Sequence, residues 1–516
     1  MLLLLLSPLW PLMRFHRRST TVLALLAASA CGGDQTGQTT IAPSSVTVPY
    51  FTYSTKSDEA RRHVQAGERL DDTGYPFKAN DEFKRAVAAD SSFGYAYLRV
   101  AELGQTVDEY STNLQRAVAR LGSANPVERL LIQSEARLED NDTQGSLAFL
   151  RQVTQLDSMN PRAWATLGVH EYGSNRRDDA IRSLERALAL DSTYAGPMFA
   201  LDEIYLFAEP KDVAKAEHYA LAGQKLWPRE PTSFRHVGQL RRAQGRPEEA
   251  IAAYTQQIAL DPAEALPYQL RGNTNTFAGH YDAARADYDA AIRLGKPAEK
   301  VNTALSRAFV DAYAGDVDAS LKAQSELVQA IDGLHVPSPR QDKANVRYAQ
   351  AIIAIIRGRL AIADTAVQDY EVSQMTEARM ANSPGAVRFF QAQVDFFKGA
   401  LAAARGDLKA AQAHADDIER VRKADNGPDK DRQLLGLRGF IALMGKNYAA
   451  ADSLLKAADP ANSFMHFTYW RALAMEGLGK TAEEKVLLQT IAAYNFTSPE
   501  NPAVHHDAIT KLAALK

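Results

Sequence analysis

The sequence predicts an all-α solenoid built from antiparallel helix pairs. Small residues recur at fixed offsets: Gly238 and Gly272 are 34 positions apart, and Gly168 precedes Gly238 by 70, which is one period of 34 and one of 36. No run alternates between apolar and polar residues as a strand would, and good helix formers such as Ala, Leu and Glu fill the repeats. A repeat of this length indicates stacked helical units rather than one closed core.

Each repeat is expected to hold two short helices. In the unit at 161–192, Trp164 and Gly168 lie along one side of a first helix, the polar stretch 173–179 interrupts the pattern, and Ala180 resumes it. Small residues are expected where the two helices approach closely, and Trp164 and Leu184 are expected to fill the space beside them. The small residues at these positions are Gly168, Ala180, Gly238, Ala250, Gly272 and Ala284.

These residues give the chain its resemblance to the tetratricopeptide repeat (TPR) family. The first helix has a large residue that is followed, after two intervening residues, by Leu and Gly. The second helix has an Ala and then a large residue, and a Pro stands near the end of the unit. The match is best at 161–192, 231–262 and 265–296. The resemblance implies a right-handed superhelix whose first helices line a concave surface.

Five segments follow from these patterns. We expect a signal peptide over 1–30, a lipidated cysteine and flexible linker over 31–56, and a TPR array over 57–333. A loop is expected over 334–345, where two prolines occur, and divergent TPR-like helical repeats over 346–516.

The N-terminus resembles a bacterial lipoprotein signal peptide. Three arginines between residues 14 and 18 precede an apolar run at 22–27, and the small residues Ala28–Ala30 precede Cys31. This resemblance implies cleavage before Cys31 and lipidation of its sulfur. Met13 is an alternative start of the leader, and a plain secretory signal with an incidental cysteine remains the alternative interpretation.

The residues after the cysteine bear on localisation. Gly32 stands where an Asp often marks inner-membrane retention of lipoproteins, so the resemblance implies a lipid-anchored protein of the bacterial cell envelope. The outer membrane is favoured, with the protein facing the periplasm or exposed at the surface. Gly, Thr, Ser, Gln and Pro enrich the stretch from Gly32 to about Ser57, which predicts a flexible tether.

Composition and motifs argue against several function classes. The net charge of −3 disfavours a general nucleic-acid binder, and Cys31 is the only cysteine. Ala474 to Thr481 fits a relaxed phosphate-loop pattern but is expected to be a turn between two helices, and His505–Asp507 is expected to be a solvated terminal turn. No catalytic motif is recognised, so we expect no enzyme, no metal and no cofactor.

The resemblance also implies a partner-binding groove along the first helices. Basic and amide side chains in it would favour a protein or peptide that is acidic or ends in a free carboxylate. Leu270 and Ala304 stand where chaperone-type carboxylate clamps have an Asn and a basic residue, so an intact clamp is not expected. The candidate groove residues are Arg162, Thr166, Tyr172, Phe199, Arg235, His236, Gln239, Arg242, Gln269, Asn273, Lys300 and Arg307.

Three functions follow, in descending order of support. The first is a membrane-tethered, non-catalytic scaffold that binds a protein or peptide in the cell envelope. The second is a lipoprotein that captures a glycan or another small ligand, which ranks lower because the repeats carry few large insertions. The third is an enzyme that uses the divergent region 346–516, where no acid–base or nucleophile arrangement is evident.

Overall fold

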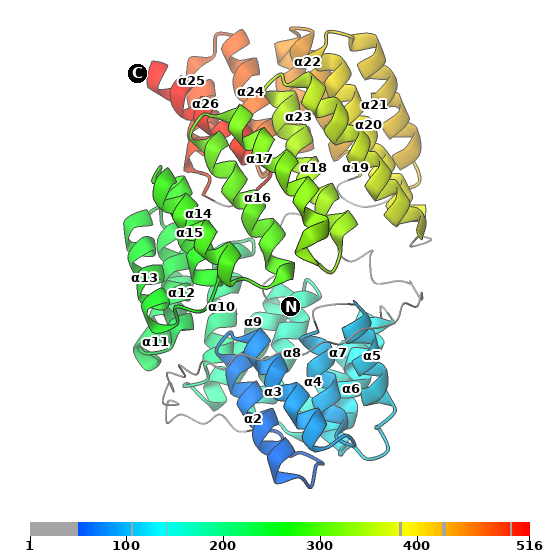
Figure 1. The fold of residues 1–516 in the computed structure, drawn as a ribbon, viewed down its shortest axis with the longest axis vertical. Coiled ribbons are helices and arrows are strands. Elements are labelled where there is room, and N and C mark those ends of the chain that lie inside the picture. Colours follow the sequence, from blue (N-terminus) through cyan, green and yellow to red (C-terminus); the bar gives the residue numbers. More distant parts are fainter. Residues whose placement is uncertain are drawn as a thin grey trace. The chain divides into compact units, whose positions relative to one another are not determined.

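The computed structural model describes residues 50–104, 107–140, 142–380, 384–425, 430–495 and 498–515. Within these residues the chain forms 25 α-helices and one 3₁₀ helix, with no β-strand, so the all-α prediction is confirmed (Figure 1). The helices fall into two compact units, which we call the N-terminal unit (50–261) and the C-terminal unit (262–515) and describe separately.

The N-terminal unit consists of six helix pairs. Their bounds are α2 (Asp58–Asp72) with α3 (Pro76–Ala89), α4 (Gly94–Glu102) with α5 (Val107–Val118), α6 (Pro126–Glu139) with α7 (Thr143–Leu156), α8 (Pro161–Gly173) with α9 (Arg177–Leu190), α10 (Ala195–Phe207) with α11 (Val213–Leu226), and α12 (Pro231–Ala243) with α13 (Pro247–Leu260).

The C-terminal unit also consists of six pairs and ends in a single helix. Their bounds are α14 (Leu266–Phe277) with α15 (Tyr281–Leu294), α16 (Pro297–Tyr313) with α17 (Val317–Ala330), the 3₁₀ helix η2 (Ile331–Leu334), α18 (Pro339–Ile356) with α19 (Leu360–Met380), α20 (Pro384–Ala404) with α21 (Leu408–Arg422), α22 (Arg432–Met444) with α23 (Tyr448–Ala458), α24 (Met465–Gly477) with α25 (Thr481–Ala493), and α26 (Asn501–Ala514). The loop expected at 334–345 is shorter, because α18 already begins at Pro339.

Capping residues fix where the helices begin. At α6, Asn125 Oδ1 accepts from the Glu128 backbone N–H at 3.0 Å, and Glu128 Oε2 accepts from the Asn125 N–H at 3.1 Å. Pro126 occupies the first helical position, where no backbone donor is needed. Within each unit, the first helix of a pair also packs on the second helix before it, so these local signals add up to a continuous stack in each unit.

The predicted small residues lie where paired helices touch. A Cβ atom on Gly238 would lie 2.5 Å from Cε1 of the buried Tyr254, and one on Gly168 would lie 2.7 Å from Cγ of Leu184. Ala180, Ala250 and Ala284 are completely buried. Trp164 is only half-buried and donates its indole N–H to Ser158 O at 2.9 Å, so Leu184 rather than Trp164 fills the space beside Gly168.

Replacing Gly238 with valine should destabilise the N-terminal unit by about 3 kcal/mol, because the branched side chain would overlap the Tyr254 ring in a close-packed interface. Urea denaturation monitored by circular dichroism would measure the loss. Gly122→Val is the matched control, since a Cβ there meets no heavy atom within 4 Å. Equal midpoints for the two variants would refute the close approach at Gly238.

Two buried histidines make the C-terminal unit sensitive to acid. Burial lowers the pKa of His466 to about 3 and that of His505 to about 4. Both rings therefore stay neutral in the folded unit, whereas in the unfolded chain they take up a proton below about pH 6.5.

The unfolding free energy should therefore fall as pH drops from about 6.5 towards 4, by about 1.4 kcal/mol per pH unit for each histidine. Denaturation at several pH values, compared between the native chain and His466→Leu, would isolate one histidine from the acidic groups that titrate in the same range. The variant should lose stability less steeply; parallel pH profiles would contradict a buried neutral His466.

Candidate functional site

The first helices of the N-terminal unit face one another around its interior. α4 contacts α6, and α10 contacts both α8 and α12. Asp72 at the end of α2 accepts hydrogen bonds from Arg162 of α8 and from Tyr194 before α10, and Thr232 of α12 donates to the backbone carbonyl of Thr73. We call the surface formed by α2, α4, α6, α8, α10 and α12 the inner face of this unit.

An extended segment of the chain itself, residues 50–56, lies across the N-terminal ends of α4, α6 and α8. Asn125 Nδ2 donates to Thr52 O at 2.6 Å, and the Ser54 N–H donates to Glu128 Oε1 at 2.8 Å. Capping side chains of the array therefore bind backbone groups of this segment, and such contacts do not depend on the segment's own side chains.

Aromatic side chains pack the same segment against the helices. Phe51 is buried with its ring centroid 6.4 Å from that of Tyr95, and Tyr53 stacks on Tyr95 at 5.5 Å. At its start, Tyr50 O accepts from Asn160 Nδ2 at 3.5 Å. The segment thus has backbone contacts along its length and ring contacts at alternate positions, as expected for an extended chain.

This segment overlaps the linker predicted at 31–56. Its described part, 50–56, is extended and packed against the helices. Cys31 and the remainder of the predicted leader and linker lie outside the described residues.

A buried ionic network connects the helices deeper in the inner face. Arg162 NH1 donates to Glu68 Oε2 at 2.8 Å, and Arg162 NH2 donates to Asp72 Oδ2 at 2.7 Å. Arg99 Nε lies 3.2 Å from Glu68 Oε1, which also accepts from the Tyr95 hydroxyl at 2.6 Å. Burial by itself would raise the pKa of the Glu68 carboxyl, but the positive charges of Arg99 and Arg162 together have a larger, opposite effect. The pKa of Glu68 is therefore lowered, and the side chain is ionised.

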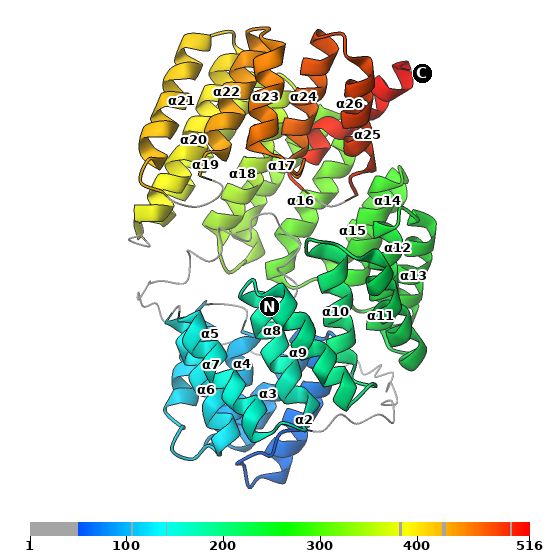
Figure 2. The same ribbon diagram turned by 180° about the vertical axis from the view of Figure 1, so that it is seen from behind.

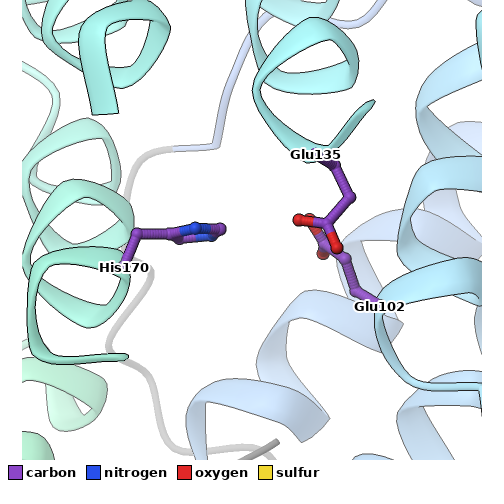
Figure 3. A group of neighbouring side chains, drawn as sticks. All are labelled: Glu102, Glu135 and His170. Atoms are coloured by element: carbon purple, nitrogen blue, oxygen red, sulfur yellow. The ribbon is translucent and has the colours of Figure 1, made fainter. Parts of the chain in front are cut away.

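Beside this network, three potential ligand side chains converge from three helices. Glu102 of α4, Glu135 of α6 and His170 of α8 point towards a common centre (Figure 3), and one ligand atom from each lies within 4.8 Å of the others. Tyr110 donates to Glu135 Oε1 at 2.8 Å, and Arg99 forms an ion pair with Glu102.

The surroundings of this group perturb its titration. Burial raises the pKa of Glu102 to about 7, with Arg99 opposing the rise and Glu135 adding to it. Burial lowers the pKa of His170, although Glu102 works against that shift. Two carboxylates and an imidazole that lie this close together can share a proton or hold a cation.

Three predicted groove residues meet in a second buried network, with acids of α10. Arg235 NH2 donates to His236 Nε2 at 2.9 Å, so the His236 Nδ1–H donates to Asp202 Oδ2 at 2.7 Å. Phe199 stacks on the His236 ring at 4.1 Å, and Arg235 NH1 donates to Glu203 Oε1 at 3.1 Å. Burial and Arg235 hold the pKa of His236 well below its usual range, so the ring is a neutral structural group.

The other predicted residues of the N-terminal unit lie along the same face. Arg162 belongs to the ionic network, and Gln239 and Arg242 are buried on α12. Thr166 and Tyr172 are partly exposed on α8, and Thr166 lies one turn before His170. The basic groups Arg162 and Arg235 therefore have acidic partners within the chain and are not open to an external ligand.

In the C-terminal unit, the final helix packs against the first helices. α26 contacts α16, α18 and α24 (Figure 2). Asn501 Nδ2 donates to the Tyr313 hydroxyl at 3.0 Å, and Asp507 accepts from Tyr469 at 3.1 Å and pairs with Arg357. The expectation of a solvated turn at 505–507 is wrong, because His505 is buried against the Tyr313 ring.

The predicted groove residues of this unit lie on α14 and α16. Asn273 is buried and accepts from the Tyr288 hydroxyl at 2.6 Å, and Arg307 Nε donates to Asp289 Oδ1 at 2.6 Å. Gln269 and Lys300 are partly exposed, and their side chains form no hydrogen bond or ion pair within the described ranges. These two side chains are available to a ligand.

The turn expected between Ala474 and Thr481 is present. α24 ends at Gly477 and α25 begins at Thr481, and Gly479 between them adopts a left-handed φ of +70°. A phosphate loop follows a strand, whereas this turn joins two helices.

Sequence reasoning missed the Glu102, Glu135 and His170 group. Glu102 lies on α4, where the repeat pattern is weak, so the pattern does not mark it as an inner position. His170 was accessible to sequence reasoning, because it follows the candidate Thr166 by one helical turn.

Comparison with known proteins supports the repeat assignment. A family profile described as tetratricopeptide repeat matches residues 233–268. No curated protein matches the chain.

Several solved structures are similar to parts of the chain. A structure of MamA protein is 20% identical over 33% of this chain and 91% of its own, with a TM-score of 0.28. MamA from Desulfovibrio magneticus RS-1 is 15% identical over 33% of this chain and 95% of its own, with a TM-score of 0.29. A tetratricopeptide repeat protein from Parabacteroides merdae is 14% identical over 68% of this chain and 99% of its own, with a TM-score of 0.31.

The profile match falls on the same unit that the periodicity singled out, and consecutive helix pairs continue on both sides of it. This part of the chain, residues 233–268, matches the tetratricopeptide repeat family.

Proposed function

We propose that the chain is a non-catalytic scaffold, tethered to a bacterial membrane, that holds a protein or peptide partner in the cell envelope. Tetratricopeptide repeats form protein-interaction scaffolds, and the extended segment 50–56 on the inner face carries this proposal. The array already binds a polypeptide backbone there through its capping side chains, so its first helices have the chemistry to bind a second one.

The first helices α14 and α16 are the favoured place for the partner. α14 contacts α16, and they carry the partly exposed Gln269 and Lys300. An ammonium group without an acidic partner among the described residues, with an amide on the contacting helix, suits an acidic peptide or a C-terminal carboxylate.

Reversing the charge of Lys300 should weaken partner binding about tenfold, equivalent to about 1.4 kcal/mol. The bound protein would be identified by quantitative co-purification from envelope extracts, and its affinity for Lys300→Glu would then be measured. Lys322→Glu on the second helix α17 is the matched control, since that side chain is 78% exposed and pairs only loosely with Glu326. Equal affinity for both variants would exclude Lys300 from the binding surface.

Membrane tethering is proposed from the sequence around Cys31. No helix among the described residues is long and apolar enough to span a bilayer. Under the proposal, Cys31→Ser releases the protein from the membrane fraction and abolishes incorporation of a labelled fatty acid, while Ser44→Ala in the same segment leaves both unchanged. Membrane association that survives Cys31→Ser would contradict a lipid anchor at Cys31, and a native chain found in the soluble fraction would favour a plain secretory signal.

A further inference from the structure

We propose that the N-terminal unit binds a divalent transition-metal ion between Glu102, Glu135 and His170. The scaffold function does not require this site, and the sequence alone predicts no metal. The proposal rests on the donors present, their convergence and the charges around them.

The donor set suits a first-row divalent ion. An imidazole nitrogen with two carboxylates is typical of zinc and manganese sites, whereas magnesium and calcium prefer oxygen ligands alone. Each donor comes from a different helix, so the ion would join α4, α6 and α8 at one point (Figure 3).

Small side-chain movements would close the site. The ligand atoms lie within 4.8 Å of one another, and two donors on a tetrahedral zinc are about 3.3 Å apart. Their backbones lie on packed helices, so rotation about the side-chain bonds supplies the remaining contraction. Water would complete the coordination, as in zinc sites with three protein ligands.

The groups around the ligands fit this role. Tyr110 donates to Glu135 Oε1 at 2.8 Å and so helps to orient this carboxylate. Among the described residues, no hydrogen bond involves the His170 ring, so a nitrogen lone pair is open to the ion. Such outer contacts orient metal ligands in known sites.

Arg99 is the cation that would compete with the ion for Glu102. It has alternative partners, since NH2 lies 2.6 Å from Asp71 Oδ2 and Nε lies 3.2 Å from Glu68 Oε1. Glu102 can therefore turn to the ion while Arg99 stays paired. Two carboxylates and one neutral imidazole carry two negative charges, which a divalent ion balances.

A second group in the C-terminal unit provides a contrast. Asp395, His414 and Asp417 also bring ligand atoms within 4.8 Å. There His414 Nδ1 is already bonded to Asp395 Oδ1 at 3.0 Å, and Asp417 is paired with Arg420 at 2.5 Å. His414 is a matched control, because it belongs to a similar His–acid group but its ring nitrogen is already bonded to a carboxylate of that group.

The test uses the full-length chain, purified in detergent and stripped with EDTA. Zn²⁺ binding is measured by calorimetry and by metal analysis after dialysis, with Mn²⁺ in parallel, and Co²⁺ reports the ligand geometry through its visible absorption. The variants are Glu135→Gln and His170→Gln, with His414→Gln as the control. Circular dichroism verifies that each variant folds.

We expect one tightly bound Zn²⁺ per chain, weaker Mn²⁺ binding as the general affinity order predicts, and affinity at least about tenfold lower in both ligand variants. The control should bind as the native chain does. If Glu135→Gln does not fold, His170→Gln decides the question, because that ring is only partly buried. The absence of stoichiometric Zn²⁺ binding, unchanged binding in His170→Gln, or loss of binding in the control would overturn the proposal.

Discussion

Replacing Arg162 with methionine should destabilise the N-terminal unit by about 3–5 kcal/mol, the range observed when one partner of a buried ion pair is removed. The guanidinium is 5% exposed and bonds both Glu68 and Asp72. Methionine would fill much of its volume but leave the two carboxylates facing each other inside the protein. Urea denaturation of the native chain and the variant would measure the difference.

Two further variants make this result specific. Arg182 on α9 is 68% exposed and pairs with Asp179, so Arg182→Met should cost less than about 1 kcal/mol. Adding Asp72→Asn to Arg162→Met should restore part of the stability, because it removes one of the stranded charges. If Arg162→Met cost no more than Arg182→Met, the ionic network would not hold the inner face together.

Truncating Trp470 to alanine should destabilise the C-terminal unit by about 3–5 kcal/mol. The indole is 2% exposed, stacks on Phe440 with ring centroids 4.2 Å apart, and meets the His466 ring edge-on at 5.2 Å. α22 and α24 both contribute to this aromatic contact, so the cavity would open between successive repeats and could not collapse without moving a helix.

Chemical denaturation would measure this loss, with Leu478→Ala as a control. Leu478 directly follows α24 but is 39% exposed, so its truncation should cost much less. A Trp470→Ala variant whose midpoint matches that of Leu478→Ala would show that this ring does not join the repeats.

The sequence predicts helix pairs well because each pair is specified locally. Gly238 and Tyr254 are only 16 residues apart, and the small size of the glycine follows from one contact between two neighbouring helices. The same local logic predicts the turn at Gly479. The repeat pattern weakens after residue 345, where α18, α19 and α20 are longer than the helices of a regular repeat.

The inner face could not be predicted in the same way, because it depends on contacts between distant repeats. Arg162 was expected to be open to an acidic partner, yet its partner Glu68 lies 94 residues earlier. Nothing in a 34-residue period encodes how far the stack curves, and that curvature brings α2 to α8. The same limit applies to the convergence of Glu102, Glu135 and His170 and to the packing of α26.

The most direct test of the proposed scaffold is site-specific photo-crosslinking in living cells. A photoreactive amino acid at Gln269 on the first helix α14 should form a covalent adduct with one protein partner, while the same residue at Lys322 on the second helix α17 should form none. Absence of an adduct at Gln269, or equal adducts at both positions, would contradict the assignment of partner binding to the first-helix face.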